Sequence, residues 1–131
     1  MQNRVQTLYQ LLAIAAGGAV GAVLRFLMSN GVYRVTGNDF PYGTLVINIF
    51  GSFVLGMLFV LLLEKLVVSA EWRLGLTVGL IGAFTTFSTF SVETLLLIEE
   101  GQLLKAALNI VLSVALCLFA AWLGMSLGRQ L

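Results

Sequence analysis

The chain has 131 residues, of which 60% are apolar and only 10% are charged, with 7 Lys and Arg against 6 Asp and Glu. Average soluble chains carry about a quarter charged residues, so this composition excludes a soluble domain. The sequence has no histidine, no nucleophile–base set and no phosphate loop, which argues against an enzyme, and it lacks the basic surface that nucleic-acid binding needs.

Four long apolar runs predict four membrane-spanning helices, at residues 8–29, 43–63, 74–98 and 103–127. Each run reaches the length of about 20 residues that a helix needs to cross a bilayer. The first run is kept as a span, because too few apolar residues precede the Ala13-Ile14-Ala15 site for a signal peptide. We therefore expect an all-α membrane protein that forms a single four-span domain over residues 1–131.

The basic residues are nearly balanced between the two sides of the membrane. An even number of spans places both termini and the loop between spans two and three on one side. Two interpretations remain open: local placement or Arg4 alone sets the orientation, or the chain inserts both ways and pairs antiparallel. The first side carries Arg4, Lys65, Arg73 and Arg129, and the second carries Arg25, Arg34 and Lys105.

The first span carries a stripe of small residues that ends in a charge. Gly17 and Gly21 are spaced so that helix backbones can approach closely, which indicates a packing surface. Arg25 lies four residues further along, where a guanidinium facing lipid is costly. It either snorkels to the interface or gives a vestibule a positive potential, and the glycine stripe favours the vestibule.

The second span carries Thr44, Asn48, Ser52 and Gly56 on one stripe at i+4 spacing. The amide of Asn48 lies deep in the span, where a polar side chain must find a partner. That partner is either a neighbouring helix or a passing anion to which the amide NH₂ donates, and the sequence leaves both interpretations open.

The third span contains the most unusual stretch, residues 82–91, with five hydroxyl residues and three phenylalanines inside an apolar run. Hydroxyls and rings both recur every three residues, a spacing that eclipses only in a 3₁₀ helix. We therefore predict that this helix is broken, tightened or unwound near Gly82. A membrane tolerates such a break only where protein buries it or where it lines a path. Carbonyls exposed there suit a hard cation such as Na⁺.

Two further polar positions have alternative interpretations. Glu93 is a functional candidate because ionisable residues inside spans are costly, or it is an interfacial residue near the helix end. Asn109 and Ser113 either continue a polar lane along the fourth span or bond to other helices.

These groups favour a small anion as the ligand. Hydroxyls and an amide donate hydrogen bonds, and the rings of Phe87 and Phe90 offer positive edges. Such donors hold an ion weakly enough to release it. Because four helices cannot comfortably enclose a pore within one chain, we also expect an oligomer.

Three motifs resemble the Fluc (CrcB) fluoride channels: residues 17–25, residues 43–53 and residues 82–91. The resemblance implies a dual-topology, antiparallel homodimer with two fluoride pores and a structural Na⁺ at its centre. Asn109 and Cys117 match no position of these motifs. The site residues that the resemblance implies are the carbonyls of Gly82 and Thr85 for Na⁺, Arg25 for the vestibule, Asn48, Phe87, Phe90, Ser88, Thr89, Thr44 and Ser113 for the fluoride path, and Glu93 for its polar lane.

We thus expect a channel that lets fluoride leave a bacterial cell passively across the inner membrane. One alternative is a small proton-coupled transporter that works through Glu93. Another is an assembly subunit that transports nothing, although such a scaffold has no need of a hydroxyl-rich break.

Overall fold

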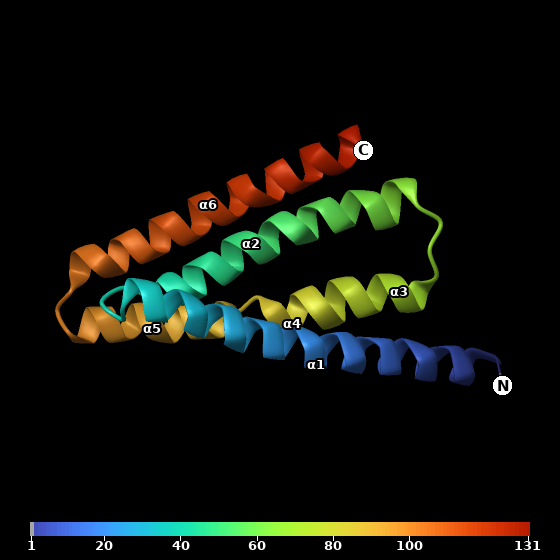
Figure 1. Ribbon diagram of the computed structural model, residues 1–131, viewed down its shortest axis with the longest axis horizontal. Helices are drawn as coiled ribbons and strands as arrows, with labels where there is room; N and C mark the ends of the chain where they lie inside the picture. The colour runs from blue at the N-terminus through green and yellow to red at the C-terminus, as the bar shows by residue number, and fades with distance from the viewer. Residues whose placement is uncertain (1) are drawn as a thin grey trace.

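A computed structural model describes residues 2–131 and consists of helices that run back and forth along one axis (Figure 1). Four helical segments are long and apolar enough to cross a membrane, and they confirm the predicted all-helical architecture of a multi-pass membrane protein. Both termini and the connection between the second and third segments lie at one end of the bundle (Figure 1). The four segments are Asn3–Thr36, Tyr42–Lys65, Ala70–Glu99 and Leu103–Gln130.

Helix α1 covers Gln2–Thr36 and continues beyond residue 29, where we expected the first span to end. It stops at Gly37, which adopts a positive φ of 76° and donates its N–H to the Tyr33 carbonyl at 2.9 Å. A left-handed glycine of this kind is a common helix terminator. Arg25 therefore lies well inside the helix rather than near its end.

Helix α2 covers Tyr42–Phe59 and continues as the π-helical segment η1, Val60–Lys65. Helix α6, Leu103–Gln130, runs beside α2 and makes the most extensive helix contact in the chain (Figure 1). Gly124 makes this contact possible, because a Cβ there would overlap the carbonyl of Phe53.

The third crossing is interrupted. Thr85 and Thr86 are extended, with ψ of 159° and 119°, whereas Gly82 is helical with φ −60° and ψ −36°. The break therefore lies three residues beyond the predicted position. The helix before it is also wider, not tighter, than an α-helix. The elements of this crossing are α3 Ala70–Leu74, η2 Gly75–Ile81, α4 Gly82–Phe84 and α5 Phe87–Glu99.

The glycine stripe of α1 packs against η2, as the sequence predicts. A Cβ on Gly17 would overlap the carbonyl of Gly75, and one on Gly21 would overlap the carbonyl of Leu80. The two backbones are thus in direct contact, which only residues without side chains permit. This contact fixes the position of the break along the length of α1.

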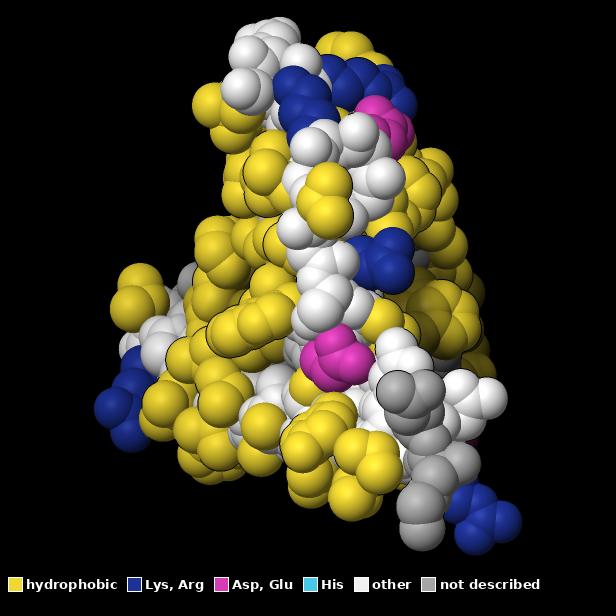
Figure 2. All heavy atoms as spheres, turned by 90° about the vertical axis from the view of Figure 1, so that its right-hand side faces the viewer, with side chains coloured by type: hydrophobic (Ala, Val, Ile, Leu, Met, Phe, Trp, Pro, Cys, Tyr) yellow, Lys and Arg dark blue, Asp and Glu magenta, His cyan; other side chains and the backbone are white. Residues whose placement is uncertain are grey.

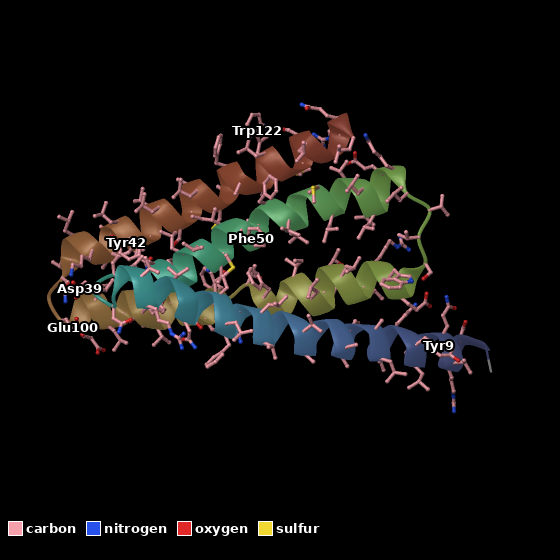
Figure 3. The ribbon with its side chains drawn as sticks, viewed as in Figure 1. Tyr9, Asp39, Tyr42, Phe50, Glu100 and Trp122 are labelled. Carbon is pink, nitrogen blue, oxygen red and sulfur yellow. The ribbon has the colours of Figure 1, made fainter. Side chains whose placement is uncertain are left out.

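The outer surface is mostly apolar. Figure 2 looks onto the end that carries both termini and shows hydrophobic side chains over most of that face, with charged groups between them. Trp122 points outward from α6, away from α2 (Figure 3). Such a surface suits a lipid environment, in which every backbone polar group is satisfied within the helices.

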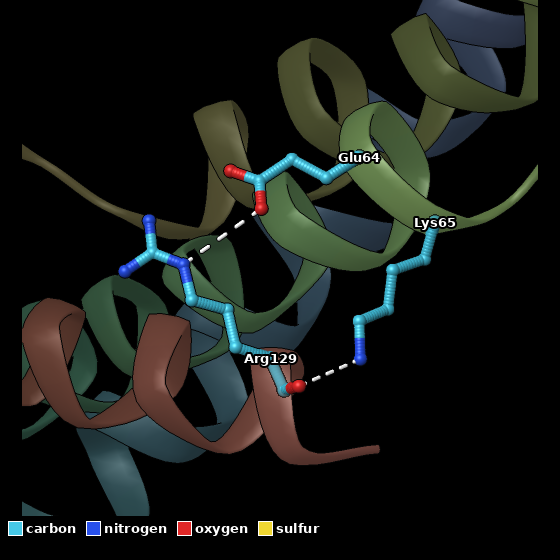
Figure 4. Close-up of polar contacts among 3 residues, drawn as sticks. All are labelled: Glu64, Lys65 and Arg129. Carbon is cyan, nitrogen blue, oxygen red and sulfur yellow. Dashed lines mark hydrogen bonds and ion pairs between the residues drawn. The ribbon is translucent and has the colours of Figure 1, made fainter.

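The ends of α6 and η1 are joined by polar contacts (Figure 4). The Arg129 guanidinium lies 3.7 Å from Glu64, and the Lys65 ammonium donates to the Arg129 carbonyl at 2.8 Å. Exposed ion pairs contribute about 0–1 kcal/mol, so these contacts order the chain end rather than hold the fold together.

Candidate functional site

The break in the third crossing is closed by one side chain from α2. The Thr86 N–H donates to Asn48 Oδ1 at 2.8 Å, and Asn48 Nδ2 donates back to the Thr86 carbonyl at 2.9 Å. In an uninterrupted α-helix the Thr86 N–H would bond to the Gly82 carbonyl. Asn48 therefore replaces a lost helix bond, while the second hydrogen of its amide is not needed for this pair.

Thr86 also caps α5. Its hydroxyl accepts a hydrogen bond from the Thr89 N–H at 3.2 Å and contacts the hydroxyls of Thr89 and Ser88 at 3.0 and 3.3 Å. Ser88 and Thr89 are thus exposed members of a cap cluster. The role of Thr86 was not predicted from the sequence, although a threonine directly before a helix is a recognised N-cap signal.

A cavity of about 400 Å³, hereafter the central cavity, lies between the break, α2 and α6. It brings together four of the seven predicted path residues, while Thr44, Ser88 and Thr89 do not line it. Its lining combines hydrogen-bond donors with aromatic rings and contains no charged side chain. The polar and aromatic lining residues are Asn48, Ser52, Thr85, Thr86, Phe87, Phe90, Ser113 and Cys117.

The rings of Phe87 and Phe90 both line the central cavity. Their centroids lie 5.4 Å apart with an interplanar angle of 46°, so the two rings are tilted against each other. Phe87 is 79% exposed, whereas Phe90 is half-buried. One chain therefore leaves the ring of Phe87 almost uncovered.

Ser113 and Asn109 differ in how their polar groups are used. Ser113 is only 8% exposed, and its hydroxyl has no hydrogen-bond partner within residues 2–131. Asn109 is 1% exposed and donates to the Thr94 hydroxyl at 2.9 Å, while Thr94 donates to the Phe90 carbonyl. The amide of Asn109 thus joins α6 to α5, and of these two residues Ser113 is the one that lines the central cavity with a free polar group.

A second polar cluster lies nearer the end of the bundle. Glu93 Oε1 accepts hydrogen bonds from the Thr44 hydroxyl at 2.8 Å and from the Tyr33 hydroxyl at 3.1 Å. Glu93 Oε2 is buried without a partner among the described residues. Tyr33 could not be paired with Glu93 from the sequence, because 60 residues separate them.

Tyr33 and Glu93 both line a cavity of about 380 Å³, hereafter the mouth cavity. Asp39 and Glu100 line it as well and lie at the end of the bundle opposite the termini (Figure 3). Lys105 also lines it and donates to the backbone carbonyl of Asp39 at 3.0 Å. Charged groups thus surround the mouth cavity, in contrast to the central cavity.

The backbone at the break leaves a carbonyl oxygen without its helix donor. The N–H and the hydroxyl of Thr85 both donate to the Ile81 carbonyl at 3.0 Å. The Gly82 carbonyl has lost the Thr86 N–H to Asn48, and Gly82 is exposed. A carbonyl without its helix donor is the kind of hard oxygen that Na⁺ prefers in broken membrane helices.

Arg25 is half-buried on α1, and its guanidinium makes no ion pair with a carboxylate of residues 2–131. Its role in a vestibule stays a prediction.

Comparison with known proteins places this geometry in context. A family model described as "CrcB-like protein, Camphor Resistance (CrcB)" matches residues 12–125. A protein of Methylococcus capsulatus named "Fluoride-specific ion channel FluC" is 58% identical over 121 residues, which are 92% of this chain and 53% of that protein. This chain thus spans about half the length of that relative.

Two further relatives carry the same name and are matched over nearly their whole length. The protein of Geobacter sulfurreducens is 50% identical over 121 residues, which are 92% of this chain and 98% of the relative. The protein of Hydrogenovibrio crunogenus is 51% identical over 121 residues, which are 92% of each chain.

Proposed function

Because the chain belongs to the CrcB family, we propose that it is a fluoride-selective ion channel that lets fluoride leave the cell passively. The observation that carries the proposal is the central cavity, which offers hydrogen-bond donors and ring edges without a charged side chain. A fixed arginine or lysine would hold a small anion tightly, whereas neutral donors bind it weakly enough for conduction.

Four residues form the proposed path through the central cavity. Ser113 has a buried hydroxyl that needs a partner, and Asn48 has an N–H beyond the one that closes the break. Phe87 and Phe90 present the positive edges of their rings to the ion. Fluoride, which is small and accepts hydrogen bonds strongly, suits these groups.

The polar positions outside the central cavity extend the proposed path. Thr44 and Glu93 lead toward the mouth cavity, and Ser88 and Thr89 flank the start of α5. Arg25 gives a vestibule a positive potential that attracts anions.

The working unit of the proposal is an antiparallel homodimer. The exposure of Phe87 in a single chain supports it, because a second copy would cover this ring and complete the wall of the path. The near balance of basic residues supports dual topology. We propose the bacterial inner membrane as its location, because the chain has four helices long and apolar enough to cross a lipid bilayer.

A structural Na⁺ at the dimer centre fits the donors at the break. Gly82 and Thr85 would hold it through backbone carbonyls from each copy. The cation would neutralise four carbonyl dipoles that otherwise face one another, and it would thereby hold the two broken helices together.

Reconstitution into liposomes tests the proposal. Fluoride efflux should be fast, electrogenic and indifferent to chloride, and a comparable chloride flux would contradict the assignment. A flux that needs a proton gradient and ends with Glu93→Gln would instead indicate a proton-coupled transporter. Absence of any flux from the pure protein would indicate an assembly subunit.

A further inference from the structure

We propose that Tyr33 is a positioning residue of the ion path, whose hydroxyl fixes the carboxylate of Glu93 beside Thr44. The inference rests on the proposed channel function and adds to it a residue from α1, the helix that contributes nothing to the central cavity.

The hydrogen bonds at Glu93 come from two different helices. Tyr33 on α1 donates to Oε1 at 3.1 Å, and Thr44 on α2 donates to the same oxygen at 2.8 Å. With a single donor, the carboxylate could still rotate about that contact. Two donors on one oxygen fix the carboxylate, so that its other oxygen, Oε2, stays buried and unpartnered.

The Tyr33 ring packs closely against Gly43 of α2, which restricts the movement of the ring. Gly43 is buried against it, and a Cβ at this position would overlap Cε2 of Tyr33. Gly43 directly precedes Thr44 in α2. The same turn of α2 therefore contacts the Tyr33 ring through Gly43 and supplies the Thr44 hydroxyl to Glu93. A shift of the ring would move the Tyr33 hydroxyl away from Glu93.

No basic side chain of residues 2–131 forms an ion pair with the Glu93 carboxylate. Among the other residues that line the mouth cavity, Asp39 and Glu100 are acidic, and the ammonium of Lys105 donates to the Asp39 carbonyl. The polar partners of Glu93 among residues 2–131 are therefore two neutral hydroxyls. The position of the Glu93 carboxylate therefore depends on both the Tyr33 and the Thr44 hydroxyl. A carboxylate released from one would swing within the mouth cavity and repel an approaching anion.

The first experiment removes one oxygen atom. Tyr33→Phe keeps the ring on Gly43 and deletes the donor, and Tyr9→Phe makes the same change at an exposed site on α1. We expect fluoride efflux to fall roughly tenfold in Tyr33→Phe, the equivalent of losing one hydrogen bond to a charged group. Efflux should be unchanged in Tyr9→Phe. Wild-type efflux in Tyr33→Phe would overturn the proposal.

An infrared measurement separates positioning from packing. The carboxyl band of Glu93 is the one that Glu93→Gln removes, and its frequency reports the hydrogen bonds of that group. We expect the band to shift in Tyr33→Phe and in Gly43→Ala, which displaces the ring, but not in Tyr9→Phe. Reduced efflux with an unshifted band would overturn the proposal, because Tyr33 would then act through packing alone.

The two measurements also distinguish this inference from the channel assignment. If the wild-type protein moved no fluoride, the proposed function would fail, yet the band shift would still test the contact. If the wild-type protein conducted and neither variant changed band or efflux, only the role of Tyr33 would fail.

Discussion

Asn48 and Thr86 lie 38 residues apart in the chain and exchange two hydrogen bonds, of 2.8 and 2.9 Å. Through this pair an amide on α2 satisfies both backbone groups of a residue at which the third crossing stops being helical. Unsatisfied backbone groups at membrane depth cost several kcal/mol, so the pair is what allows the crossing to remain broken.

Asn48→Ala should therefore destabilise the protein and stop conduction. It leaves the N–H and the carbonyl of Thr86 unpaired, at about 1–3 kcal/mol for each buried group. Unfolding in detergent measures the loss. Asn48→Asp keeps an acceptor for the Thr86 N–H but sets its other carboxylate oxygen against the Thr86 carbonyl, so it should unfold at least as easily as Asn48→Ala, and its negative charge should also abolish fluoride efflux. Equal stability of Asn48→Ala and the wild type would contradict the role of the pair.

Replacement of the cavity rings should affect conduction more than assembly. Phe87→Ile and Phe90→Ile remove the ring edges and keep an apolar side chain of similar bulk, so we expect lower fluoride efflux from a dimer that still assembles. Phe26→Ile serves as the control, because this ring on α1 is exposed and does not line the central cavity. Unchanged efflux in both cavity variants would remove the rings from the path.

Ser113→Ala should separate function from stability. The Ser113 hydroxyl is buried without a partner, so its removal should leave stability unchanged or raise it by about 1 kcal/mol. Fluoride efflux should nevertheless fall, because the path loses a donor. A destabilised Ser113→Ala variant would show that the hydroxyl has a structural partner, and efflux at the wild-type rate would exclude it from the path.

Gly17 and Gly31 of α1 allow a comparison between a closely packed and an open position of the same helix. Gly17→Ala places a methyl group against the Gly75 carbonyl, and such overpacking costs about 1–3 kcal/mol. Gly31 has open space around it, so Gly31→Ala should gain about 0.5–1 kcal/mol through the better helix propensity of alanine. Thermal unfolding in detergent compares the two, and equal midpoints would contradict close packing of α1 on η2.

Removal of sodium should weaken the proposed dimer. If the carbonyls of Gly82 and Thr85 hold Na⁺ between two copies, replacing Na⁺ by a large organic cation should lower the association constant measured in lipid. The same exchange should leave the helix content of each chain unchanged, which circular dichroism checks. An association constant independent of Na⁺ would argue against the site.

The sequence predicted the spans because apolar runs long enough to cross a bilayer have few other uses. It also placed the packing stripe of α1 correctly, since Gly17 and Gly21 fit a known close-contact spacing. The end of α1 was missed because the apolar run stops at residue 29, whereas the polar residues that follow, such as Asn30 and Arg34, continue the helix until Gly37 ends it. The interruption was expected near Gly82, yet glycine is helical there and two threonines are extended.

The site was less predictable than the fold, because its contacts join residues that are distant in the chain. The pattern singled out Asn48 and Glu93 as costly polar groups but not the partners that satisfy them. Thr86 and Tyr33 supply those partners from positions that look ordinary in the sequence. Asn109 was predicted either to continue a polar lane or to bond to another helix. Its amide donates a hydrogen bond to the Thr94 hydroxyl of α5, as the second interpretation expects.

The placement of Gly43, Thr44 and Asn48 on α2 has an evolutionary consequence. Each residue of an α-helix turns about 100° around the axis, so inserting or deleting one residue between Pro41 and Asn48 would swing the amide out of reach of Thr86. Lineages that keep the broken crossing cannot change the length of this segment. Length variation should accumulate instead in the turn at residues 66–69, which joins η1 to α3 at the opposite end of the bundle.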